Sequence, residues 1–160
     1  MILVSHIDKK QLVHLLERFG LETQWVDDLD NIPGSFWGDP EAGLIGNQLY
    51  LRSDTPIQSA LHEASHYICM DNTRRAKLHT NSGGDYDEEN AVCYLQILLS
   101  EKLDQFSKGQ MMQDMNEWGY SFRLGSAEKW FAEDAADAKQ WLIDNQLINE
   151  QEHICWNIRH

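Results

Sequence analysis

The stretch TPIQSALHEASHYICM, residues 55–70, predicts the helix around which this chain folds. It opens with Thr55 and Pro56, which are preferred at the N-cap and at the first helical position, and no glycine or further proline follows. Apolar residues recur within it at steps of three and four positions: Ile57, Leu61, Ala64 and Ile68. This spacing places them on one face, so we expect an amphipathic helix that begins near residue 55.

Within this helix, the segment from His62 to His66 fits the pattern H-E-x-x-H. Residues four apart lie on the same helical face, one turn from each other, so both imidazoles can reach a single metal ion. Glu63 lies beside such an ion rather than on it, where its carboxylate can take a proton from a metal-bound water. The motif therefore predicts two metal ligands, His62 and His66, and a catalytic base, Glu63.

A third ligand is needed to complete the site, and we expect it from a second helix that Asp85 opens and that runs to about Leu103. Glu88 shares its face with an apolar stripe and so points toward the core, where a carboxylate is costly unless it binds a cation. Glu89 lies on a mixed face, typical of a solvated acid. We therefore predict Glu88 as the ligand and keep Glu89 in reserve; the alternative is that Glu88 only stabilises the helix N-terminus.

The H-E-x-x-H motif, with Glu88 in an E-x-x-A context that ends at Ala91, resembles the minimal gluzincins, which include the ImmA/IrrE-like peptidases. The resemblance implies a compact zincin-like metal-binding domain, bound zinc and a downstream glutamate that completes the site. The longer zincin pattern H-E-x-x-H-x-x-G-x-x-H is excluded, because this chain has Cys69 and Asn72 where that pattern requires glycine and histidine.

The segment SALHEASH, residues 59–66, together with Arg74 and Arg75, also resembles the bacterial elongation factor P hydroxylase. That family has a similar helix and a nearby arginine pair. The resemblance implies an enzyme that uses iron to hydroxylate a modified lysine of a protein.

The two resemblances imply different reactions from one set of ligands. Two histidines and a carboxylate with open positions suit Zn²⁺ with a bound water, and the same triad also holds Fe²⁺ for oxygen chemistry. Our leading hypothesis is a zinc-dependent hydrolase that cleaves a peptide bond. The alternatives are an iron-dependent protein hydroxylase and a non-catalytic binding module in which the metal only ties two helices together. Weaker candidates, for substrate binding, are His79, Tyr86, Arg74 and Tyr120.

The composition indicates one domain over residues 1–160, because 42% of the residues are hydrophobic and can form one core of ordinary size. No apolar run approaches the roughly 20 residues of a membrane span, and the N-terminus lacks the basic region of a signal peptide. We therefore expect a cytoplasmic protein without a membrane partner. The three cysteines have no C-x-x-C spacing, which is typical of reduced thiols.

The formal net charge of −13 opposes binding to a nucleic acid backbone, so we expect no nucleic acid partner. A peptide or protein substrate is what the two resemblances imply. One basic cluster, residues 74–77, follows the metal helix, where positive charge stabilises a helix C-terminus. The alternative is that these side chains hold an acidic peptide segment near the cleft. Nothing in the sequence indicates an oligomeric state.

The rest of the chain predicts an α+β fold that is mostly helical. Two short extended runs, residues 44–45 and 48–51, flank Gly46-Asn47 as in a tight hairpin, which predicts a small antiparallel sheet. In zincin-like folds such a sheet borders the metal cleft, and its edge strand can accept an extended peptide. Three further helices are expected: one between Asp8 and Gly20, one ending at Gly119, and a long one capped by Ser126.

Overall fold

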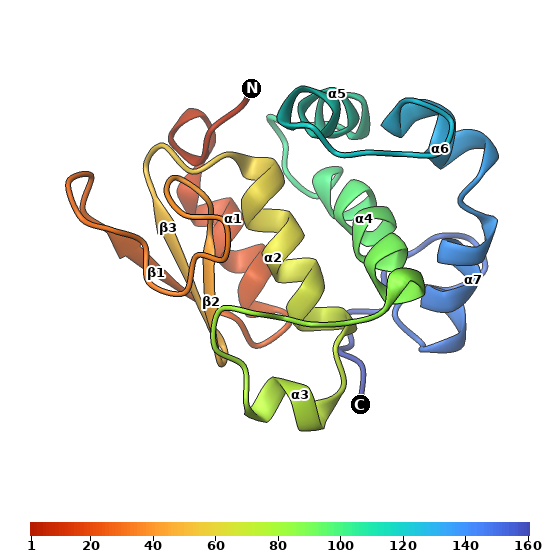
Figure 1. Cartoon of the computed structure of the whole chain (residues 1–160), viewed down its shortest axis with the longest axis horizontal. Helices are drawn as coiled ribbons and strands as arrows, with labels where there is room; N and C mark the ends of the chain where they lie inside the picture. The colour runs from red at the N-terminus through yellow and green to blue at the C-terminus, as the bar shows by residue number, and fades with distance from the viewer.

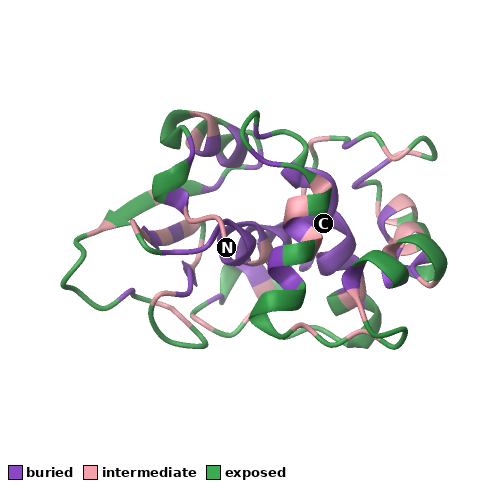
Figure 2. Cartoon of the chain, turned by 90° about the horizontal axis from the view of Figure 1, so that it is seen from above, coloured by how far each residue is buried: buried purple, intermediate pink, exposed green.

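Helix α2 (Ile57–Cys69) runs through the centre of the molecule, and all of its residues except His62 are buried. In the computed structural model, which describes all 160 residues, α2 packs most extensively against α4 (Tyr86–Ser100), as Figure 1 shows. Figure 2 shows the buried residues concentrated in these central helices. A helix enclosed on all sides has little freedom to shift, so α2 is a rigid support for the side chains of the predicted motif.

The N-terminus of α2 differs by one residue from our expectation. Pro56, rather than Thr55, is the N-cap, and its carbonyl accepts the first helical hydrogen bond from the backbone N–H of Ala60 at 3.1 Å. The hydroxyl of Thr55 instead accepts a hydrogen bond from the backbone N–H of Arg52 at 3.0 Å, closing the turn before the helix. This difference does not change which residues share a face of α2.

The sheet has three strands in the order β1-β3-β2, formed by β1 (Glu22–Val26), β2 (Gly43–Ile45) and β3 (Gln48–Arg52). Strands β2 and β3 form the predicted antiparallel hairpin, with Gly46 at a positive φ of 57° in the turn. Strand β1 pairs with β3 in parallel, so the sheet is mixed and our prediction of an antiparallel sheet is wrong for this pair. The residues of β1 are exposed or half-buried and carry no apolar alternation, which left the strand without a sequence signal.

The outer edge of β2 is covered by other parts of the chain. The backbone N–H of Leu44 donates to the carbonyl of Gly34 at 3.3 Å, and the carbonyl of Leu44 accepts from the N–H of Thr80 at 2.9 Å. These are the groups that an added strand would need. The expectation that an extended peptide pairs with this edge of the sheet is therefore wrong for β2.

Six further helices complete the fold. Asp8 caps α1 (Lys9–Glu17) as predicted, and Gly119, at φ 107°, ends α5 (Lys108–Trp118). The long helix expected after Ser126 is divided at Asp134-Ala135 into two helices. The others are short or follow that division: η1 (Val4–His6, a 3-10 helix), α3 (Asn72–Ala76), α6 (Ala127–Glu133) and α7 (Ala136–Asp144).

These elements surround α2 and α4 from two sides (Figure 1). The sheet and α1 lie beside α2, whereas α5 and α7 pack against α4. The buried apolar residues form one continuous cluster, and the three cysteines are free, with only Cys155 exposed. No helix has the length and apolar character needed to cross a membrane.

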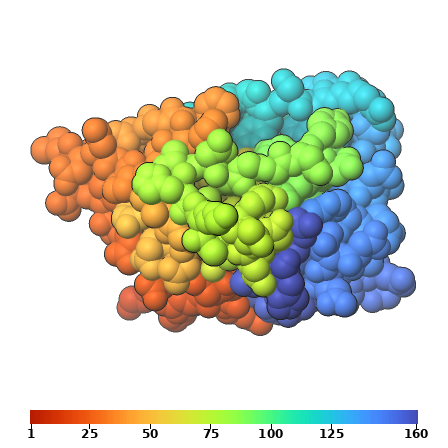
Figure 3. All heavy atoms as spheres, turned by 60° about the horizontal axis from the view of Figure 1, so that its bottom comes forward, coloured from red at the N-terminus to blue at the C-terminus, as the bar shows by residue number.

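The C-terminal residues return to the end of α2. The backbone N–H of Arg159 donates to the carbonyl of Ile68 at 2.9 Å, and a guanidinium N–H of Arg75 donates to the carbonyl of Arg159, also at 2.9 Å. Figure 3 shows this tail, in dark blue, against the yellow-green segment that contains α3. Residues more than 80 positions apart in the sequence are thereby joined at the C-terminal end of the central helix.

Candidate metal centre

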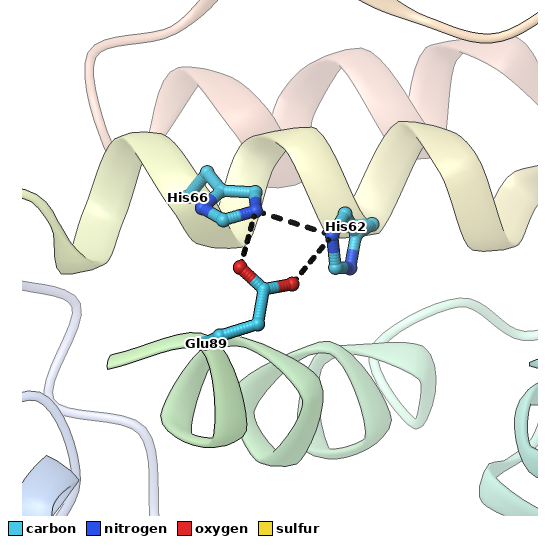
Figure 4. Close-up of side chains that lie close together, drawn as sticks. All are labelled: His62, His66 and Glu89. Carbon is cyan, nitrogen blue, oxygen red and sulfur yellow. Dashed lines mark hydrogen bonds and ion pairs between the residues drawn. The ribbon is translucent and has the colours of Figure 1, made fainter. Parts of the chain in front are cut away.

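Helices α2 and α4 bring together three side chains where they face each other: His62, His66 and Glu89. The Nε2 atoms of the two histidines are 3.1 Å apart. Glu89 reaches both rings, with Oε1 3.3 Å from Nε2 of His62 and Oε2 3.2 Å from Nε2 of His66. Figure 4 shows the two imidazoles and the carboxylate converging on one point between the helices.

Local sequence explains how the two helices present these groups. His62 and His66 are one turn apart on α2, so their rings are neighbours on one face. The side chain of Asp85 accepts a hydrogen bond from the backbone N–H of Glu88 at 2.9 Å and begins α4 beside α2. Glu89 is consequently in the first turn of α4, with its carboxylate directed at the histidines.

Glu88, the predicted third ligand, does not join this group. Its side chain is 3% exposed and lies between two guanidinium groups. Arg74 donates to both carboxylate oxygens, at 2.9 and 2.5 Å, and Arg159 donates to Oε1 at 3.0 Å. A buried carboxylate does require a cation, as we argued, but these cations are arginines of the chain itself. The prediction is corrected to Glu89, the reserve candidate.

The surroundings of Glu89 explain why the sequence favoured Glu88 as the third ligand. Its side chain is 47% exposed, which agrees with the mixed face read from the sequence, but the exposed side opens into a pocket. Burial by itself raises the pKa of Glu89, yet hydrogen bonds to His62 and His66 outweigh it and hold the pKa well below its usual range. Glu89 is therefore a carboxylate, the form in which it can bind a cation.

The pocket beside the three side chains has a volume of about 440 Å³. Its inner wall carries three acids, Glu41, Glu63 and Glu89, and no lysine or arginine lines it. Three exposed aromatic residues lie around it: Phe36, Trp37 and Trp118. Acidic groups in a concave site with no cation of the chain are a favourable environment for a bound metal ion.

Glu63, the predicted base, lines the same pocket as His62 and His66, and its side chain is buried. Burial raises the pKa of Glu63, an effect that the neighbouring imidazoles reduce only in part. A carboxylate with a raised pKa is a better proton acceptor at neutral pH than an ordinary surface glutamate. Glu63 thus has the location and the basicity of a general base.

Glu41 belongs to the site but was missed by the sequence analysis. It is buried in the loop before β2, and burial raises its pKa to about 7, with a further contribution from the negative charge of Glu63. The loop bends back onto α2, where the hydroxyl of Ser59 accepts a hydrogen bond from the backbone N–H of Ala42 at 2.9 Å. No motif marks Glu41, because its position depends on this long-range contact.

Of the four candidates for substrate binding, only Tyr120 lines the pocket. Its hydroxyl donates to Oε1 of Gln58 at 2.7 Å, so its proton is already engaged. Arg74 is paired with Glu88, and Tyr86 is 76% exposed on the outside of the protein. The exposed His79 lies next to the pocket segment, with its Nδ1 2.8 Å from the hydroxyl of Thr80. Arg74, Tyr86 and His79 are therefore outside the site.

In the basic cluster after α2, Arg75 stabilises the C-terminal end of the helix, as the sequence predicted. The guanidinium of Arg75 donates to the carbonyl of Tyr67 at 3.0 Å and to that of Met70 at 2.5 Å. Both carbonyls belong to the last turn and the cap of α2, which have no partner further along the helix. Arg75 is buried by these contacts and is not available to a peptide.

The donor set fits a single transition-metal ion. Ligand atoms bound tetrahedrally at about 2.0–2.1 Å from one zinc ion lie about 3.4 Å from one another. The two Nε2 atoms are 3.1 Å apart, and Glu89 meets each of them with a different carboxylate oxygen, at 3.3 and 3.2 Å. With one ligand atom taken from each residue, all three atoms lie within 4.8 Å of one another, so a modest movement of the Glu89 side chain completes such a site. Comparison of the chain with protein-family models, curated proteins and solved structures found no match.

Proposed function

We propose that this protein is a metal-dependent hydrolase that cleaves a peptide bond, with Zn²⁺ bound by His62, His66 and Glu89. The observation that carries the proposal is the position of Glu63, a buried carboxyl with a raised pKa that lines the same pocket as the three ligands. A structural metal site requires ligands alone, whereas hydrolysis also requires a base beside them. We further propose that α2 corresponds to the active-site helix of a zincin-like fold.

His62, His66 and Glu89 would hold the ion, which when bound would supply polarisation of the scissile carbonyl and a lowered pKa for a water molecule. Glu63 accepts a proton from that water and returns it to the leaving amine. Glu89 remains ionised throughout, because its low pKa keeps it a carboxylate ligand. Each of the four residues thus has one role, three in binding and one in proton transfer.

The shape of the pocket supports a peptide or protein substrate. Phe36, Trp37 and Trp118 line the pocket together with the acids and expose aromatic rings. Exposed aromatic groups around a concave site are typical of surfaces that bind a ligand. The free cysteines agree with the cytoplasm, a reducing compartment, as the place of this reaction.

The substitution Glu63→Gln tests the proposal directly. We expect it to lower peptide hydrolysis about 10²–10⁴-fold, since the base is lost, while the protein keeps one zinc ion per chain. The measurements are turnover of a peptide library and elemental analysis of tag-free protein. Asp87→Asn, which removes an exposed acid from the same turn of α4 as Glu89, is the matched control and should leave both values unchanged.

The outcome of this experiment separates the possible roles of the site. If Glu63→Gln changes no activity and a chelator unfolds the protein, the metal is structural and the hydrolase proposal fails. If the wild-type protein cleaves no peptide in the library with zinc bound, the hydrolase proposal also fails.

An iron-dependent protein hydroxylase is the second candidate, because two histidines and a carboxylate can hold Fe²⁺ as well as Zn²⁺. The resemblance to the elongation factor P hydroxylase includes Arg74 and Arg75, whose contacts to Glu88 and to the end of α2 are structural. Protein purified without oxygen would then contain one ferrous ion per chain. With O₂ and a two-electron reductant, it would insert one oxygen atom into a C–H bond of a partner protein and release the other as water. This result would contradict the hydrolase proposal and support the hydroxylase.

A further inference from the structure

Gln96 lies two turns after Glu89 on α4 and has no exposed surface. Its side-chain amide fills the space between α4 and α2 and contacts one of the metal-ligand candidates. Oε1 of Gln96 is 2.9 Å from Nδ1 of His62, the ring nitrogen that faces away from the proposed ion. Nε2 of Gln96 is 2.9 Å from the backbone carbonyl oxygen of Gln58 and 3.3 Å from the hydroxyl of Tyr120.

These contacts determine which way the amide of Gln96 points. The backbone carbonyl of Gln58 can only accept a hydrogen bond, so the group facing it must be the NH₂ of Gln96. A flipped amide would place two acceptor oxygens 2.9 Å apart in a buried site, which is strongly unfavourable. The carbonyl oxygen of Gln96 therefore faces His62.

The orientation of Gln96 in turn determines the protonation of His62. The carbonyl oxygen of Gln96 has no proton to give, so Nδ1 of His62 must carry one and donate it. In the metal-free protein Glu89 also accepts a hydrogen bond from His62, at Nε2, and that proton must be released before a metal binds. Because Nδ1 stays protonated, the neutral ring then presents a lone pair on Nε2. That lone pair points at Nε2 of His66 and at Glu89, where the ion is proposed to bind.

We propose that Gln96 is a positioning residue that holds His62 in the Nδ1–H tautomer and fixes its ring for metal binding. The inference deepens the proposed function and rests on its metal site. A neutral imidazole with a free lone pair on Nε2 is the form that binds a metal, and a hydrogen bond at the other nitrogen selects it. The contact also raises the basicity of the ligand.

The same network extends to the wall of the pocket. The hydroxyl of Tyr120 donates to the side chain of Gln58 at 2.7 Å and accepts from Gln96, while its ring stands edge-on to His62, with the centroids 5.5 Å apart. His62 is thus confined by a hydrogen bond at its outer nitrogen and by an aromatic ring at its side. Nδ1 of His66, in contrast, is buried and has no hydrogen-bond partner, so His66 is an internal reference without this control.

The tautomer of His62 can be measured directly in metal-free protein. We expect two-bond ¹H–¹⁵N correlations of histidine-labelled Glu89→Ala in chelator, where no carboxylate competes for a proton on Nε2, to show His62 as the Nδ1–H form at a pH where the ring is neutral. The spectrum of His62→Asn identifies its signals. Observation of the Nε2–H tautomer for His62 would overturn the proposal, and this measurement requires neither metal nor an altered Gln96.

Two substitutions of Gln96 separate tautomer control from packing. Gln96→Leu removes the acceptor, and we expect its affinity for Zn²⁺ or Co²⁺ alone to fall about 10–100-fold. In Gln96→Glu, a protonated carboxyl can donate to the carbonyl of Gln58 and keep its other oxygen facing His62, so this variant should retain the Nδ1–H signal and bind zinc within about 3-fold of wild type. The control is Ser100→Ala, which removes another buried polar group one turn later on α4 and should not change metal affinity.

The proposal fails if Gln96→Leu binds zinc as tightly as wild type, or if Gln96→Glu binds zinc as weakly as Gln96→Leu. These outcomes are independent of the reaction. The protein could show the Nδ1–H tautomer and a Gln96-dependent affinity for zinc but hydrolyse no peptide. That result would overturn the hydrolase proposal and leave the positioning role of Gln96 intact.

Discussion

The first turn of α4 carries two adjacent glutamates in opposite surroundings. On one side, Glu88 is enclosed by Arg74 and Arg159, so one carboxylate faces two guanidinium groups. On the other side, Glu89 meets only the imidazoles of His62 and His66, and further acids line the same pocket. The first cluster supplies its own cations and is closed, whereas the second has a surplus of negative charge and is open to solvent.

This difference shows how burial and function separate in neighbouring residues. A buried acid that is matched by cations of its own chain stabilises the fold when intact and has no capacity left for a ligand. A partly exposed acid that is matched only by imidazoles remains available to a cation from solution, because an imidazole can release its proton and bind the same ion. The less buried of the two glutamates is therefore the better candidate ligand.

The largest effect that distinguishes the two clusters should come from Glu89→Gln. At a zinc concentration about 1,000 times Kd, binding raises the free energy of unfolding by about 4 kcal/mol. We expect Glu89→Gln to lose most of this increment, because the charged ligand is gone, while its free energy of unfolding in chelator falls by only about 1 kcal/mol, as is usual for a partly exposed ion pair. Urea denaturation with and without zinc measures both values, and Asp87→Asn should retain the full increment. If zinc raises the free energy of unfolding of Glu89→Gln as much as that of wild type, Glu89 is not a metal ligand.

The reverse pattern is expected for Glu88→Gln. Loss of the buried charge leaves Arg74 and Arg159 without their partner, so the free energy of unfolding in chelator should fall by about 3 kcal/mol, the lower end for a broken buried ion pair because both arginines are partly exposed. Urea denaturation in chelator is the measurement. The comparison breaks down if Glu88→Gln leaves stability unchanged and instead abolishes zinc binding, since Glu88 would then be the ligand.

A smaller, pH-dependent change in the free energy of unfolding is expected from Glu41→Gln, in the pocket that Glu89 also lines. Glu41 has a pKa of about 7 when folded and an ordinary value of 4.5, so the folded protein holds this proton more tightly and loses stability as the pH rises from about 4.5 to 7. This rise in the pKa of Glu41 corresponds to a loss of at most about 3 kcal/mol in the free energy of unfolding. We expect a loss of about 2 kcal/mol, because water enters the pocket and reduces the cost of the charge.

Denaturation of the metal-free protein at several pH values checks this prediction. At pH 8 the variant Glu41→Gln should be more stable than wild type, and at pH 4 the two should be equal, because Glu41 is protonated in both states there. If the difference in free energy of unfolding between Glu41→Gln and wild type is constant with pH, the pKa of Glu41 is not raised in the folded protein.

Local patterns were sufficient for several parts of the fold. The apolar spacing of residues 57–68, the capping side chain of Asp85 and the Gly46-Asn47 turn correctly predicted α2, the start of α4 and the β2-β3 hairpin. Each depends on residues within a few positions of one another, which interact before any distant contact forms. The end of α4 fell three residues before Leu103, since helix ends respond to neighbouring elements as well as to sequence.

By itself the sequence determined that two histidines share one face of a buried helix and that a second helix begins with two adjacent acids. Only the tertiary structure decided which of the acids meets the histidines, because Glu88 is taken by Arg159, which the C-terminal tail brings from 71 positions away. The same holds for Glu41 and Gln96, which approach the site from a loop and from two turns along α4. Helical periodicity is a local property, whereas the pairing of charges depends on distant segments that meet only when the chain folds.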